Sequence, residues 1–275
     1  MLKTVTHAVR FVLPFGVTVV EFGLVTFISA LVGISLVIGA SRFLKTRFLA
    51  AFALGVYLWY FTDTLGDANY LGVNEGFTFS AELVALVVLF VVGLTVFFAM
   101  DRRMFTAGVS DGYGALVVGV VAALALGLHG LGEGADFGFT AAQTPFSSLF
   151  DAFGGLSASA SWVLHKMMEP TIAAVCYVSI ARVGNGKATA RLTDALIIAS
   201  VFVIPSVVGS VVGYYTTFDH TYIFALGLGT SVYALARAGR ALYSPSEGAD
   251  SWLSVKMALA AVLGFLLIFI AALLH

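Results

Sequence analysis

The chain has 275 residues, of which 60% are hydrophobic and only 11% are charged, and its formal net charge is −1. Soluble domains carry roughly 25% charged residues, so this composition excludes a protein whose whole surface faces water. With neither a basic block nor an acidic tail, the sequence gives no reason to expect a nucleic-acid partner.

The apolar residues come in long blocks, such as 17–40 and 252–274. Each exceeds the ~20 residues that a helix needs to cross the hydrocarbon core of a bilayer. We therefore predict an all-α polytopic membrane protein, with residues 1–275 forming a single transmembrane domain in the lipid bilayer. Eight helices are expected near 15–40, 48–69, 80–100, 112–138, 157–182, 193–216, 220–238 and 252–274.

Basic residues alternate between the predicted loops. Lysine and arginine follow the first, third, fifth and seventh helices, whereas the second, fourth and sixth loops have none. The positive-inside rule places the basic loops in the cytoplasm, so both termini are predicted to lie outside, in a plasma or inner membrane. The basic loop residues are Arg42, Lys45, Arg47, Arg102, Arg103, Arg182, Lys187, Arg191, Arg237 and Arg240.

The fourth and fifth predicted helices each carry a histidine four residues before a glutamate. These pairs are His129 with Glu133 and His165 with Glu169. A spacing of four places both side chains on one helix face, and both pairs fall at similar depth near the middle of the bilayer. Ionisable residues at this depth usually mark a site or a pathway. Two imidazoles and two carboxylates suit Zn²⁺, Mn²⁺ or Fe²⁺, so we predict a metal site from these four residues.

Three aspartates extend this set toward the predicted outer side. Asp63 and Asp67 repeat the four-residue spacing on the second helix, and Asp136 continues the His129/Glu133 face. A group of carboxylates concentrates cations at an entrance, so these are further candidate ligands or entrance residues.

Lys166 follows His165 directly, so its ammonium should lie within one turn of the predicted ligands. Two divalent ions together with this lysine would place five positive charges against the two glutamates. Each pair of like charges costs on the order of 4 kcal/mol at ~4 Å in a dielectric of ~20. The lysine is therefore predicted to tune the charge of the site, which should hold a single ion. Pro170 should open the fifth helix beside it, because proline lacks a backbone N–H.

The two motifs resemble those of the ZIP (Zrt/Irt-like) metal transporters. The segment His129-Gly-Leu-Gly-Glu133-Gly is similar to the fourth-helix motif of that family, and His165-Lys166-x-x-Glu169 is similar to its fifth-helix motif. The resemblance implies eight spans, with helices 1–3 and 6–8 as inverted repeats around helices 4 and 5. It also implies a transporter, not an enzyme, that moves a divalent ion toward the cytoplasm. Zinc is the foremost cargo, with iron, manganese and cadmium as alternatives.

The chain departs from the family pattern at several positions. Gly130 stands where the family usually has a metal-binding asparagine, and Gly132 replaces the usual proline. The second metal site that some relatives carry is therefore in question. Two other functions stay open, which are a haem-binding electron-transfer protein using His129 and His165, and a proton or monovalent-ion pathway without metal. A homodimer also remains open as the assembly.

Overall fold

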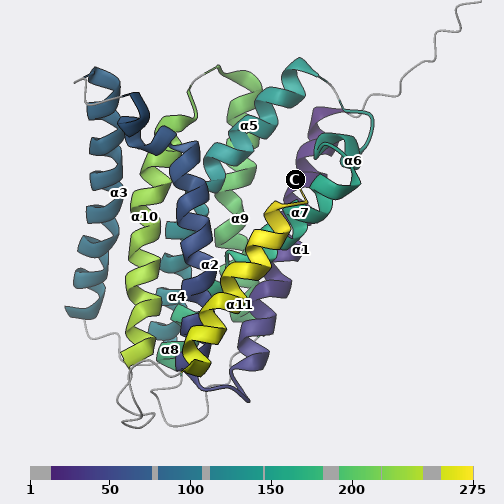
Figure 1. Cartoon of the computed structure of the whole chain (residues 1–275). Coiled ribbons are helices and arrows are strands. Elements are labelled where there is room, and N and C mark those ends of the chain that lie inside the picture. Colours follow the sequence, from purple (N-terminus) through teal and green to yellow (C-terminus); the bar gives the residue numbers. More distant parts are fainter. Residues whose placement is uncertain are drawn as a thin grey trace, which may run out of the picture.

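The computed structural model describes residues 14–75, 80–106, 112–144, 146–181, 192–217, 219–243 and 255–274, and these residues contain helices but no strand. Figure 1 shows the helices running between the two ends of one bundle, with α3 at its edge. The helices are α1 (Phe15–Ala40), α2 (Thr46–Asp67), η1 (Asn69–Glu75), α3 (Ala81–Thr106), α4 (Gly112–Gly127), α5 (Gly130–Gln143), α6 (Leu149–Ala152), α7 (Leu156–Met168), α8 (Thr171–Ala181), α9 (Leu192–Tyr215), α10 (Thr221–Arg240), η2 (Ala241–Tyr243) and α11 (Val255–Ala272).

Several of these helices suit a membrane. Among the described residues, α1, α2, α3, α9 and α11 are each long and apolar enough to cross one, and the bent pair α4–α5 makes a sixth if it is one span. The prediction of an all-helical membrane protein therefore agrees with the structure, whereas its count of eight is two higher than this criterion supports. The two remaining predicted spans coincide with the short helices α7 and α8 and with the more polar α10.

Two predicted helices are broken near their middles. The predicted helix 112–138 is the pair α4 and α5, whose axes are bent by 43° at a break that includes His129. The predicted helix 157–182 is the pair α7 and α8, separated by Glu169 and Pro170. The second break was expected from Pro170, because its ring removes a donor from the helix ladder. The first break was not expected, and no proline lies at it.

Helix α8 lies in the centre of the bundle. Its residues from Ile172 to Cys176 are completely buried, and they pack in one apolar core with residues of α1, α2, α4 and α9. The thiol of Cys176 is buried within this core. This burial holds the first turn of α8 in place, and only Pro170 separates that turn from Glu169.

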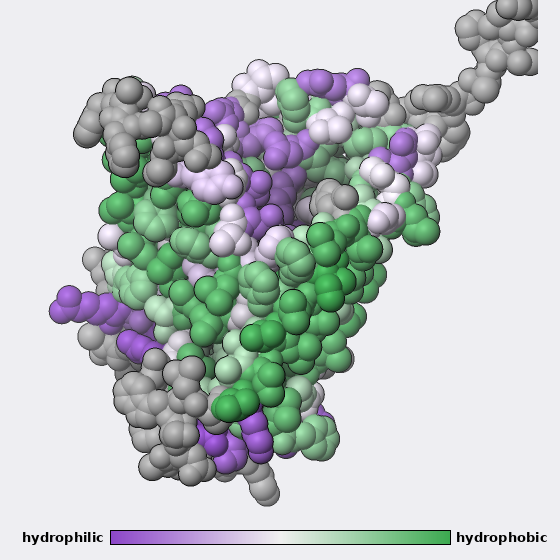
Figure 2. All heavy atoms as spheres, viewed as in Figure 1, coloured by the Kyte–Doolittle hydropathy of each residue, from purple (hydrophilic) through white to green (hydrophobic). Residues whose placement is uncertain are grey.

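The outer helices expose apolar side chains on one face. On α1 the large exposed residues Val20, Leu24 and Ile28 recur at a spacing of four. Helix α11 exposes a similar row that includes Leu259 and Leu263. Figure 2 shows the middle of this face as largely hydrophobic, with hydrophilic residues toward the upper end and again near the lower end. Apolar flanks of this kind suit contact with lipid.

The described basic residues lie where helices end or connect. Arg42 and Lys45 lie in the connection between α1 and α2, Arg102 lies in the last turns of α3, and Arg237 and Arg240 lie in the last turn of α10. These helix ends share the lower end of the bundle in Figure 1. Arg182, Lys187 and Arg191 lie outside the described residues.

Candidate metal centre

His129 lies at the break between α4 and α5, and its ring is fixed by two neighbours. The Nδ1 atom makes a short hydrogen bond with the carbonyl of Leu126, and the ring of Tyr60 meets the imidazole edge-on with centroids 4.6 Å apart. A carbonyl can only accept, so Nδ1 donates to Leu126. The Nε2 atom faces the Glu169 carboxylate, which also only accepts, so Nε2 must give up its proton to bind a cation.

Glu169 lies at the break between α7 and α8, and its side chain is completely buried. Its Oε1 atom lies 3.1 Å from His129 Nε2 and 2.9 Å from His165 Nε2, the histidine one turn earlier. This one oxygen therefore joins the imidazoles of both broken helices. A carboxylate at such depth requires positive partners, because an unpaired buried charge is costly.

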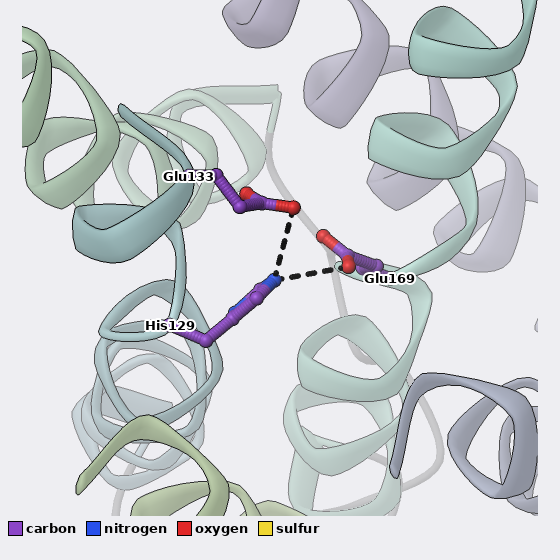
Figure 3. A group of neighbouring side chains, drawn as sticks. All are labelled: His129, Glu133 and Glu169. Carbon is purple, nitrogen blue, oxygen red and sulfur yellow. Dashed lines mark hydrogen bonds and ion pairs between the residues drawn. The ribbon is translucent and has the colours of Figure 1, made fainter. Parts of the chain in front are cut away.

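Three side chains form a group that could hold a metal ion. One ligand atom from each of His129, Glu133 and Glu169 lies within 4.8 Å of the other two. His129 Nε2 is 3.6 Å from Glu133 Oε1, one turn along the same face of α5. Figure 3 shows the three side chains pointing toward one another across the space between the two breaks. An imidazole with two carboxylates is a donor set that suits a borderline transition-metal ion.

The ammonium of Lys166 lies in the same space. Its Nζ atom is 2.5 Å from Glu133 Oε2 and 2.7 Å from Glu169 Oε2, and it is 3.4 Å from His129 Nε2. The side chain is buried with 1% of its surface exposed. The lysine was predicted to lie within one turn of the ligands. The structure places it between the two glutamates, where it neutralises half of their charge.

His165 and Asp63 lie beside this group. His165 reaches the group through Glu169, and its Nε2 atom is 3.9 Å from Asp63 Oδ2. Asp63 has 45% of its side chain exposed, so it stands between the buried residues and solvent. Of the four ligands predicted from sequence, three thus form the tight group, and His165 lies one contact away. Asp67, one turn further along α2, is exposed.

Asp136 faces a different partner. Its carboxylate makes a short ion pair with Nδ1 of His220, at the start of α10, and more than half of the Asp136 side chain is exposed. Asp136 follows Glu133 by three residues within α5, so it continues the His129/Glu133 face of the helix as predicted. However, Asp136 is not a member of the group of described residues that could hold a metal ion.

Glycines determine how α5 packs behind the centre. A Cβ atom added to Gly134 or Gly138 would collide with the backbone of α9, and one added to Gly209 on α9 would collide with that of α5. Such small residues let two helices approach closely. At Gly130 an added Cβ would collide with Ser206 Oγ. A side chain at this position, such as the asparagine of the ZIP pattern, would therefore require the Ser206 hydroxyl to move.

Sequence reasoning missed the aromatic residues around the centre. Tyr60 contacts His129, and the rings of Trp162 and Phe202 lie 5.0 and 5.9 Å from Lys166 Nζ. Trp162 could have been noticed, because it lies one turn before Lys166 on the same helix. Nothing in the sequence relates Phe202 to Lys166, because they are on separate helices.

No protein-family model and no curated protein matches the chain. The likeness to the ZIP transporters therefore rests on the two short motifs, and function is argued below from the geometry of the centre.

Proposed function

We propose that this protein moves a divalent transition-metal ion across a membrane, through the group formed by His129, Glu133 and Glu169. The observation that carries the proposal is the convergence of these three donors in a buried space between two broken helices. Broken helices at the middle of a helical membrane protein are a common way to build ion and substrate sites. His165 and Asp63 extend the donors toward the exposed surface, which provides a route of approach.

The donor chemistry supports zinc as the foremost cargo. Nitrogen and carboxylate oxygen suit Zn²⁺, Fe²⁺ and Mn²⁺, and Cd²⁺ is a further candidate. The only cysteine, Cys176, is buried in the apolar core and does not belong to the group. The likeness of the two motifs to the ZIP transporters supports the same cargo and transport toward the cytoplasm.

We further propose eight spans, built as inverted repeats. The second, third, seventh and eighth predicted spans are α2, α3, α10 and α11. If spans 1–3 are related to spans 6–8, then α2 corresponds to α10 and α3 corresponds to α11. The pair α2–α11 then corresponds to the pair α10–α3. Each pair is held by two glycines that face the partner's backbone. Gly55 of α2 meets α11 and Gly264 of α11 meets α2, while Gly93 of α3 meets α10 and Gly229 of α10 meets α3. This correspondence supports the repeat.

The charges of the centre favour a single ion. Glu133 and Glu169 provide two negative charges, and the ammonium of Lys166 already forms an ion pair with each of them. A second divalent ion would have no further carboxylate in the tight group formed by the described residues. Gly130 adds no side-chain ligand.

Zinc uptake into proteoliposomes that enclose a zinc-sensitive dye tests the proposal. Glu133→Gln and Glu169→Gln should each lower the initial uptake rate by at least about tenfold, because each removes a charged donor. Glu82→Gln is the matched control, since Glu82 is exposed in the first turn of α3, and it should leave the rate unchanged. Native rates in both site variants would overturn the proposal.

One observation favours a second candidate, a pathway for protons or monovalent cations. The ammonium of Lys166 shows that a monovalent cation fits between Glu133 and Glu169. Under this alternative the same liposomes would carry a proton or sodium flux without zinc uptake. A haem between His129 and His165 is less well supported, because both Nε2 atoms lie close to the single oxygen Glu169 Oε1 and Lys166 fills the adjacent space.

A further inference from the structure

Lys166 has two kinds of partner around its ammonium. The carboxylates of Glu133 and Glu169 lie 2.5 and 2.7 Å from Nζ. The ring centroids of Trp162 and Phe202 lie 5.0 and 5.9 Å from the same atom. Both distances fall within the ~6 Å over which an aromatic face attracts a cation.

Trp162 is held in place independently of the lysine. Its indole Nε1–H donates a hydrogen bond to Thr26 Oγ1 on α1 at 3.2 Å, and its ring packs on Phe22 and Phe153. Phe202 is almost completely buried on α9. The two rings therefore form a fixed apolar surface. The lysine side chain beside them is flexible, because four methylene groups separate its backbone from its charge.

A divalent ion and the ammonium compete for the same oxygens. When Lys166 is paired with Glu133 and Glu169, the three side chains together carry a net charge of −1. A divalent ion added at contact distance would meet a positive charge held within hydrogen-bonding range of the same two carboxylates. The repulsion is relieved when the ammonium withdraws from them, and the aromatic faces are the surface toward which it can move and remain stabilised.

We propose that Lys166 is a tethered cation that exchanges with the transported metal, and that Trp162 and Phe202 receive its ammonium when the metal binds. This inference rests on the proposed metal site. It assigns to the lysine the role of weakening metal affinity, so that the ion can leave the site again. Trp162 and Phe202 are positioning residues, because they act on the metal only through Lys166.

Equilibrium Zn²⁺ binding to purified protein tests the exchange. Lys166→Met keeps most of the side-chain length and removes the charge, so it should tighten Zn²⁺ binding by at least about tenfold. Trp162→Leu and Phe202→Leu should each weaken binding by about threefold to tenfold, and Trp162→Phe should restore most of the loss because it keeps a ring. Phe97→Leu, a buried aromatic on α3 that packs on Tyr233, is the control and should leave affinity unchanged.

A double-mutant cycle separates this role from a merely structural one. In the Lys166→Met background the two ring substitutions should have no effect on Zn²⁺ affinity. If Lys166→Met does not fold, the Trp162 and Phe202 variants with the native lysine still decide, and unchanged affinity in both would overturn the proposal. Weaker binding by Lys166→Met would also overturn it. The metal site itself fails if Glu133→Gln binds Zn²⁺ as the native protein does, so the two failures are distinguishable.

Discussion

Glu169 Oε1 lies 3.1 Å from His129 Nε2, so the break between α7 and α8 directly faces the break between α4 and α5. Neither residue belongs to an uninterrupted helix. His129 precedes the first residue of α5, and Glu169 follows the last residue of α7. Donors at helix breaks are held by the helices on both sides, and this places an imidazole and a carboxylate together inside an apolar bundle.

The proposed sidedness can be tested with two exposed residues at opposite ends of the bundle. Phe43, between α1 and α2, is 88% exposed, and Tyr215, at the end of α9, is 74% exposed. In a Cys176→Ala background, Tyr215→Cys should react with an impermeant thiol reagent on intact cells. Phe43→Cys should react only after the membrane is permeabilised, because the basic α1–α2 connection is predicted to be cytoplasmic. Labelling of Phe43→Cys alone from outside would reverse the orientation.

Close packing between α5 and α9 should make Gly134 intolerant of a side chain. A Cβ at this position would collide with the backbone carbonyl of Ser206, so Gly134→Ala should lower the free energy of unfolding by about 1–3 kcal/mol. Gly239→Ala is the matched control, since nothing lies within 4 Å of a Cβ there, and it should be neutral or stabilising. Thermal unfolding in detergent measures both. Equal stability of Gly134→Ala and the native protein would show that the helices are not in contact as described.

The ion pair between Asp101 on α3 and Arg237 on α10 should contribute to stability. Both side chains are largely buried, and Tyr233 donates a second hydrogen bond to Asp101 at 2.9 Å. Arg237→Met should lower the free energy of unfolding by about 3 kcal/mol, because it leaves a buried carboxylate without its cation. The exposed Arg240→Met should change it by less than about 0.5 kcal/mol.

The double variant Asp101→Asn with Arg237→Met supplies the check on this pair. Once both charges are absent, the loss should be smaller than the sum of the two single losses. Strictly additive losses would mean that the two residues do not interact.

The sequence predicted the members of the centre better than their roles. The four-residue spacing of histidine and glutamate identified the two pairs, because a helix places such residues on one face. Pro170 identified one helix break. The break at His129 was missed, because glycines on both sides permit a bend without requiring one. As a result, His165 was expected to be equivalent to His129, whereas in the structure it meets the group only through Glu169.

Contacts between distant segments were beyond sequence reasoning. The pairing of Asp136 with His220 depends on where α10 begins relative to α5, and 84 residues separate the two. Likewise, Phe202 reaches Lys166 only because α9 packs closely on neighbouring helices. In both cases the relevant information is the packing of whole helices, which a single sequence does not display.

Metal counting at equilibrium tests the central claim most directly. Purified protein is dialysed against buffered Zn²⁺, and zinc per chain is measured by elemental analysis, with Glu169→Ala and the exposed-site control Glu82→Gln treated in parallel. We predict one zinc ion per chain in the native protein and the control, and none in Glu169→Ala. Failure of the native protein to retain zinc, or full retention by Glu169→Ala, would contradict the account, and two ions per chain would contradict the single-ion site.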